Sequence, residues 1–306
     1  MFFLKKLFAL MLGIVVLLSL AFGCRGGQNE FALTILHTND WHGVLDDLPQ
    51  YATLVYAVRA EVENVILLDG GDLYRRGPFQ SLRGQAETEV MNAIGYDAMV
   101  FGNNDFPQND RELVNLSEHT ILQTANFPVL CGNVTQNGRV AEGFAPYVVL
   151  QRQGLRIAVI GVTSAKPWDR GFDLSRRYDF EDPAEAVARM AAEIGDSADI
   201  HIVLSHAGIA ADRRMRGVSA IVGGDDHLKL AAHAVIGDGD REIPVVQAGG
   251  ERDHYLGRLD LVFVKEAGVW VLSEFNGSLL STDDVYPDAE IAQIIDGHRV
   301  MLRDAA

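Results

Sequence analysis

The sequence predicts an α/β fold of the α+β type, in which buried strands alternate with helices. Apolar runs with the length of buried strands recur along the chain, for example at Asn64–Leu68, and helical patterns such as Glu87–Ile94 separate them. Several runs end in turns rich in glycine and aspartate, such as Asp69–Asp72. α/β proteins place functional side chains at this edge of a sheet. The 306 residues are 48% hydrophobic and 22% charged, an ordinary globular composition.

The elements follow from the period of the apolar residues. Strands are predicted at Phe31–Leu36, Asn64–Leu68, Ala98–Phe101, Pro128–Val134, Tyr147–Leu150, Arg156–Val162, Asp199–Leu204, Ala220–Val222, Pro244–Gly250, Gly257–Val264 and Val269–Glu274. Helices are predicted at Pro49–Val62, Glu87–Ile94, Asp110–Ser117, Pro183–Ile194 and Asp288–Leu302. Gln153-Gly154 indicates a hairpin, and Asp182 is a suitable N-cap before Pro183. We interpret the last three strands as one antiparallel group.

The first residues have the form of a targeting segment. Lys5 and Lys6 precede a long apolar run, which predicts a signal peptide over residues 1–23. Leu20–Cys24 resembles the lipobox of bacterial lipoproteins, so we expect lipidation of Cys24 and a lipid anchor in a bacterial membrane. The protein would then be exported, to the periplasm or the cell surface. Simple cleavage and an uncleaved anchor are the alternatives.

Charge and cysteine content exclude several classes of protein. The net charge is -16 and no run of Lys or Arg is present, which argues against binding a nucleic acid polymer. Two cysteines are too few for a disulfide scaffold or a Cys-rich zinc site. An acidic protein that binds anions must concentrate positive charge locally, through metal ions or a few arginines.

Polar side chains suited to metal binding follow five of the predicted strands. Asp40 and His42 come just after the first strand, and in extended backbone residues two apart point the same way. One polar residue at a strand end can be a simple turn former, but five such ends in succession predict a shared metal site. The candidate ligands are Asp40, His42, Asp72, Asn103, His206, Asp225 and His227.

The order of these motifs resembles the calcineurin-like metallophosphoesterases. It is most similar to the amino-terminal domain of the 5'-nucleotidase and 2',3'-cyclic-nucleotide phosphodiesterase family. The matching motifs are Thr38–Gly43, Gly71-Asp72, Gly102-Asn103, Leu204–Gly208 and Gly223–His227. The resemblance implies a four-layer α/β/β/α sandwich with two mixed sheets over residues 31–285. Residues 286–306 would be a terminal helix similar to the family's interdomain linker, with no second domain after it.

The resemblance also implies how the ligands divide. Asp40, His42, Asp72 and His227 would hold one divalent ion, and Asp72, Asn103, His206 and Asp225 the other, with Asp72 bridging. Two such ions can bridge an attacking hydroxide and neutralise charge on a phosphoryl group. The expected activity is hydrolysis of a small, nucleotide-like phosphomonoester or phosphoanhydride, or of another anionic ester.

Three positions depart from the family. The family has a His at position 104 and an Asp partner at 107, where this chain has Asn104 and Pro107. An amide can donate a hydrogen bond but cannot deliver a proton, so we expect Asn104 to be a weakened transition-state donor and turnover to be slow. Asp225 replaces a His ligand, and a third carboxylate favours Mn or Mg, with Zn or Fe as alternatives. Asp225 could instead turn away from the metals.

Arg75 and Arg76 follow Asp72 in the same loop. Either is a candidate contact for the substrate phosphate, and the alternative is a solvated loop charge. Two other functions stay open at this stage. One is a metal-binding scaffold or partner-binding protein whose catalysis has decayed, and the other is a sulfur-ester hydrolase of the same fold. No partner protein follows from the sequence.

Overall fold

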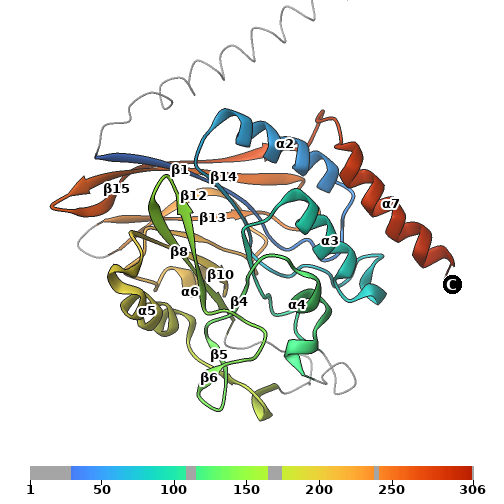
Figure 1. Ribbon diagram of the computed structural model, residues 1–306, viewed down its shortest axis with the longest axis horizontal. Coiled ribbons are helices and arrows are strands. Elements are labelled where there is room, and N and C mark those ends of the chain that lie inside the picture. Colours follow the sequence, from blue (N-terminus) through green and yellow to red (C-terminus); the bar gives the residue numbers. More distant parts are fainter. Residues whose placement is uncertain (1–28, 108–114, 165–173, 238–240, 305–306) are drawn as a thin grey trace, which may run out of the picture.

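Two six-stranded sheets pack face to face in the computed structural model (Figure 1). The structure describes residues 29–107, 115–164, 174–237 and 241–304. The predicted signal peptide, Cys24 and most of the helix predicted at 110–117 therefore lie outside the described residues. Among the residues described, no helix combines the length and the apolar character needed to cross a membrane.

The first sheet carries the strand ends of the amino-terminal half. Its strands are β1 (Glu30–Thr38), β2 (Val65–Asp69), β3 (Ala98–Val100), β4 (Val129–Leu130), β14 (Tyr255–Glu266) and β15 (Val269–Ser281). Their order is β15-β14-β1-β2-β3-β4. β1 to β4 run parallel, whereas β14 and β15 are antiparallel additions at one side. The loops that follow β1, β2 and β3 consequently leave the sheet at one edge.

The second sheet repeats this design. It contains β7 (Tyr147–Arg152), β8 (Leu155–Thr163), β10 (Ile200–His206), β11 (Ala220–Val222), β12 (Lys229–Ile236) and β13 (Glu242–Ala248), in the order β12-β13-β11-β10-β8-β7. β8, β10, β11 and β13 are parallel, and β7 and β12 are antiparallel edge strands. A small third sheet consists of β5 (Val134–Gln136), β6 (Arg139–Val140) and β9 (Asp179–Phe180).

Helices cover the outer faces of both large sheets (Figure 1). α2 (Leu48–Glu61) and α3 (Gln85–Ile94) cover the first sheet, α7 (Ala289–Asp304) packs against α2 and α3, and α5 (Pro183–Ile194) packs on the second sheet. The short helices are α4 (Thr120–Thr124), α6 (Ile209–Asp212), η1 (Gln80–Leu82), η2 (Leu116–Glu118), η3 (Leu174–Arg176) and η4 (Gly195–Ser197). The predicted α/β/β/α sandwich with two mixed sheets is therefore confirmed.

Three buried apolar clusters separate the four layers. Alternate residues of β1 serve two of them, because Ile35 faces the second sheet while Leu36 faces the helices. The third cluster joins α5 to the second sheet, for example through Val187 and Ile160. Asp182 caps α5 as predicted, since its Oδ1 accepts the backbone N–H of Ala184 at 3.0 Å.

The prediction that the last three strands form one antiparallel group is wrong. β13 belongs to the second sheet, where it runs parallel to β11, while β14 and β15 pair in the first sheet. Six of the seven β13 residues are buried, which is typical of a strand covered on both faces. Neighbouring strands in sequence need not share a sheet. β12, the antiparallel partner of β13, was not predicted.

The run predicted as one strand at Pro128–Val134 is divided between β4 and β5. Gly132 interrupts it by donating its N–H to the carbonyl oxygen of Gly161 at 2.7 Å, which ties this turn to the second sheet. Hydrophobic periodicity does not reveal such a cross-sheet hydrogen bond.

His37 is buried between the sheets near the end of β1. Within the described part of the chain, neither of its ring nitrogens has a hydrogen-bond partner. Its ring packs on the backbone of Gly257 so closely that a Cβ there would lie 2.1 Å from ring atoms. Burial lowers the pKa of His37 to about 3. The folded chain therefore excludes a proton that an unfolded chain would accept.

This exclusion predicts acid sensitivity. Between pH 6.5 and 3 the unfolded state binds one proton more at His37, so this residue alone should lower the free energy of unfolding by about 1.4 kcal/mol for each pH unit that the pH drops. His37→Leu and His37→Gln should both weaken this dependence, whatever their stability at pH 7. Urea unfolding at several pH values measures it. A dependence equal to that of the unchanged protein in both variants would contradict the assignment.

Candidate metal centre

The candidate site lies where the carboxyl ends of the two sheets meet. Loops after β1, β2 and β3 supply side chains from the first sheet, and the ends of β10 and β11 supply them from the second. The predicted ligands at this edge are Asp40, His42, Asp72 and Asn103 from the first sheet and His206, Asp225 and His227 from the second.

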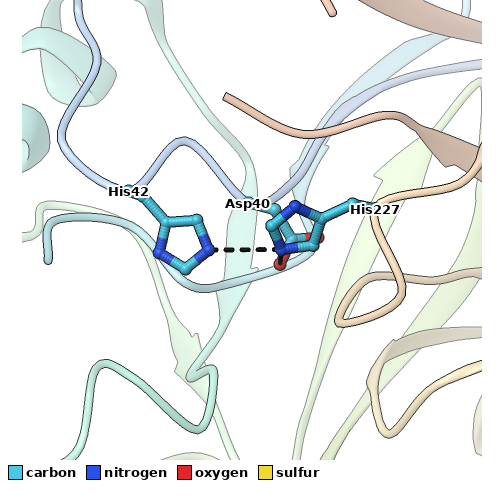
Figure 2. A group of neighbouring side chains, drawn as sticks. All are labelled: Asp40, His42 and His227. Carbon is cyan, nitrogen blue, oxygen red and sulfur yellow. Dashed lines mark hydrogen bonds and ion pairs between the residues drawn. The ribbon is translucent and has the colours of Figure 1, made fainter. Parts of the chain in front are cut away.

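One group of ligand atoms consists of Asp40, His42 and His227 (Figure 2). These atoms lie within 4.8 Å of one another. The Nε2 atoms of His42 and His227 are 3.3 Å apart, and His227 Nε2 is 3.3 Å from Asp40 Oδ1. Two imidazole nitrogens and a carboxylate thus point at one spot, which suits a divalent cation.

A second group consists of Asp40, Asp72 and His206, again within 4.8 Å. His206 Nε2 lies 3.3 Å from Asp72 Oδ1 and 3.7 Å from Asp225 Oδ1. Asp72 Oδ2 also lies 3.7 Å from His42 Nε2, so Asp72 stands between the two groups. Asp40 belongs to both groups, which the sequence did not predict.

The backbone at the ligands is not extended, so the reason given above for the pairing of Asp40 and His42 is wrong. Both residues have positive φ angles, 56° and 48°. Asp72, Asp225 and His227 share this left-handed conformation, with φ of 60°, 77° and 54°. It is uncommon for residues other than glycine and is held only where the surroundings fix it. Tight turns, rather than strand alternation, direct these side chains.

Backbone hydrogen bonds between the first two ligand loops fix these turns. Asp40 N–H donates to the carbonyl oxygen of Gly71 at 2.8 Å, and His42 N–H donates to that of Asp72 at 3.0 Å. Gly43 and Gly77 pack backbone to backbone, because a Cβ on Gly77 would lie 2.1 Å from the Gly43 carbonyl oxygen. Neither position has room for a side chain.

Partners outside the ligand set orient two ligands. His206 Nδ1 lies 2.6 Å from the carbonyl oxygen of Gly70, which can only accept, so Nδ1 carries the proton and Nε2 is left to face Asp72. Asn39 donates from Nδ2 to Asp40 Oδ2 at 2.7 Å and accepts the N–H of Ala248. Asn39 was missed as a functional residue, because its partner in β13 is distant in sequence.

The electrostatics of the cluster fit metal ions. Burial alone would lower the pKa of His206, but the carboxylates of Asp72, Asp40 and Asp225 together raise that pKa well above its usual value. Burial raises the pKa of Asp225, because it disfavours the charged form of the carboxyl group. Among the described residues, the buried atoms Asp40 Oδ1 and His206 Nε2 make no well-formed hydrogen bond, and their near neighbours are other candidate ligands, His227 Nε2 and Asp72 Oδ1, each at 3.3 Å. Buried polar groups crowded together in this way are costly, and a bound cation lowers the cost.

Asn104 and the two arginines have distinct surroundings. The Asn104 amide donates to Asp72 Oδ2 at 2.6 Å and to Asn103 Oδ1 at 3.0 Å, which joins two candidate ligands.

Arg75 is buried, so the alternative of a solvated charge is wrong for it. Arg76 is exposed, and its charge contributes to lowering the pKa of His42 after the larger effect of burial.

A four-layer sandwich with two carboxylate–imidazole groups at its carboxyl edge defines the class of two-metal hydrolases. Residues 33–229 match the Calcineurin-like phosphoesterase family, and the chain belongs to that family. The family predicted from the sequence is thereby confirmed, as is its class of metal-dependent phosphoesterases.

Known proteins agree with this membership. The trifunctional nucleotide phosphoesterase protein YfkN of Bacillus subtilis is 28% identical over 89% of this chain and 21% of its own length. The 5'-nucleotidase of Vibrio cholerae is 30% identical over 75% of this chain and 40% of its own length. The chain thus spans from about a fifth to half of the curated relatives it matches.

Solved structures show the same fold. A 5'-nucleotidase precursor from Thermus thermophilus superposes with a TM-score of 0.75 at 25% identity, covering 90% of this chain and 59% of that one. The sulfate thiohydrolase SoxB of Thermus thermophilus has a TM-score of 0.71 at 16% identity, covering 89% of this chain and 61% of that one. The latter likeness concerns the fold alone.

Because buried ligand atoms are crowded together at this edge, we expect metal ions to stabilise the protein. Mn²⁺ added to chelator-treated protein should raise the melting temperature, because an ion at 100 times its Kd adds about 2.7 kcal/mol per site. Asp72→Asn, at the position between both groups, should remove most of this gain. Asp182→Asn, at the α5 cap, is the matched control and should keep it. An unchanged melting temperature on adding Mn²⁺ would refute the centre.

Proposed function

We propose that the chain hydrolyses a small phosphomonoester or phosphoanhydride at this edge, using two divalent metal ions. The observation that carries the proposal is that two ligand groups share Asp40, with Asp72 between them. When bound, the ions activate water and neutralise charge on the phosphoryl oxygens. The residues that would hold them are Asp40, His42, Asp72, Asn103, His206, Asp225 and His227.

Burial of the proposed ligands supports binding and exclusion of water. Asp40, His42, Asp72 and His206 are nearly fully buried, so ions bound by them would lie in a region of low dielectric. Arg76 supports phosphate binding, because it is exposed and lies close enough to affect His42. The positive charge of a local arginine attracts an anion to this edge of a chain whose net charge is -16.

The proposed substrate class is nucleotide-like, supported by the names of the relatives in Bacillus subtilis and Vibrio cholerae. The leaving group should be a good one, since Asn104 and Pro107 occupy the positions of the family's proton-delivering pair. Aryl phosphates and anhydrides therefore fit better than alkyl monoesters.

We also propose that residues 31–285 form the working domain and that the protein is exported and lipid-anchored at Cys24. The support is the apolar segment after Lys5 and Lys6, with Cys24 at its end. The 5'-nucleotidase precursor among the structural neighbours is consistent with an exported protein.

The decisive experiment measures metal content and turnover of para-nitrophenyl phosphate and its bis-ester by Mn-loaded residues 25–306. Asn104→His introduces a group that can deliver a proton, and the double variant with Pro107→Asp restores both positions. Activity on the monoester should rise by up to about 10²–10⁴-fold, the usual value of general acid catalysis. Asn104→Ala is the control and should show no rise.

Other results would point elsewhere. Two bound metals without phosphoester turnover in any variant would favour a decayed scaffold or a sulfur-ester hydrolase. Fewer than one metal per chain would remove the basis of the proposal.

Asp225 sets the metal preference in this proposal. Its Oδ1 lies 3.7 Å from His206 Nε2, and replacing it with His exchanges a hard oxygen ligand for a softer nitrogen. Asp225→His should shift the preference from Mn²⁺ toward Zn²⁺, measured by competition between the two ions. Asp226→His, at the exposed neighbouring position, is the control. An unaltered preference in Asp225→His would mean that Asp225 is not a ligand.

A further inference from the structure

The loops after β2 and β3 are joined by hydrogen bonds made by the side chains of Asp105 and Arg75. Asp105, in the second of these loops, is fully buried and accepts three backbone N–H groups. Its Oδ1 accepts from Leu73 at 2.7 Å, and its Oδ2 accepts from Asp72 and Gly102, both at 2.9 Å. The carboxylate therefore fixes the backbone of the ligand Asp72 from the opposite loop.

Arg75 makes the reciprocal contact. Its Nε donates to the carbonyl oxygen of Asn104 at 2.5 Å, and its Nη2 donates to that of Phe106 at 2.9 Å. The guanidinium lies over the Tyr74 ring, 5.1 Å from the centroid, and the side chain is buried. These two donors are used on the neighbouring loop and do not face a substrate.

The two loops are also in direct backbone contact. A Cβ on Gly102 would lie 2.3 Å from the backbone nitrogen and Oδ1 of Asp72, and one on Gly71 would lie 2.8 Å from Gly102 N. The two loops therefore pack at backbone distance, and the hydrogen bonds of Asp105 and Arg75 cross the same contact.

We propose that Arg75 and Asp105 are positioning residues that hold Asp72 and Asn103 at the spacing the second metal ion requires. The inference rests on the proposed metal-dependent function and gives Arg75 a role other than substrate contact. Asn103 offers only a neutral amide oxygen, so its contribution to metal affinity depends on being held in place. The ligand pair Asp40 and His42 lies on the loop after β1, whereas the contacts of Arg75 and Asp105 given above are to the loops after β2 and β3.

The test titrates Mn²⁺ into the chelator-treated full chain by calorimetry. Arg75→Met should weaken the metal site that includes Asn103 by about 10- to 100-fold, the usual cost of losing an orienting partner, and should affect the other site less, because that site shares only Asp72 with the braced loops. Arg75→Lys should be intermediate, because an ammonium group donates without the planar fork of a guanidinium. Asp105→Asn should weaken the same site. It tests the brace independently if the arginine variants misfold.

Arg59→Met is the matched control. Arg59 likewise donates to two backbone carbonyls, of Ile94 at 2.8 Å and Gly95 at 2.6 Å, at the end of α3. Its loss should lower stability without altering either metal affinity, which separates positioning from a general structural role.

The outcomes are distinct. Two metals bound equally well by the unchanged chain, Arg75→Met and Asp105→Asn would overturn the brace and leave the proposed function standing. A higher KM in Arg75→Met with both affinities unchanged would also overturn it, in favour of a substrate contact. No Mn²⁺ binding by the unchanged chain would overturn both proposals.

Discussion

The structure depends on pairing buried carboxylates of one sheet with imidazoles of the other. Asp72 follows β2, and His206 ends β10 in the opposite sheet, with 3.3 Å between Oδ1 and Nε2. His206 also holds the carbonyl oxygen of Gly70 at 2.6 Å, and the N–H of Asp225 donates to Asp40 Oδ2 at 3.1 Å. These contacts are satisfied only when the two sheets pack with their carboxyl edges aligned. The apolar layer between the sheets supplies the driving force, and the polar contacts specify the alignment.

The same alignment explains why unfavourable features are concentrated at one edge. Left-handed backbone at the ligand turns costs on the order of 1–3 kcal/mol per residue, and uncompensated buried charge costs more. Backbone hydrogen bonds between the loops after β1 and β2, together with Asp105 and Arg75, offset part of this cost. A bound cation would lower the part of this cost that these contacts do not offset. The crowding of buried ligand groups is therefore the common cause of the local instability and of the metal affinity.

The resemblance places Asn104 and Pro107 where the family has His and Asp, and the structure shows how Asn104 is held. The Asn104 amide is hydrogen-bonded to Asp72 and Asn103, and the loop around it is fixed by Arg75 and Asp105. A rigid ligand loop is compatible with chemistry in which the metals do most of the work. It also explains how the ligand residues can be present without the proton-delivering pair.

The sequence by itself determined most of the elements and the positions of the seven candidate ligands, and its resemblance to a known family implied the four layers. Strand periodicity and strand-end polar residues such as Asp72 and His206 are local signals, and local chemistry is what a sequence records. The tertiary structure alone decided that β13 lies in the second sheet, that Asp40 faces both ligand groups and that Arg75 is buried against another loop. The physical reason is that sheet membership, side-chain direction at positive φ and hydrogen bonds between loops are settled by contacts between residues far apart in the chain.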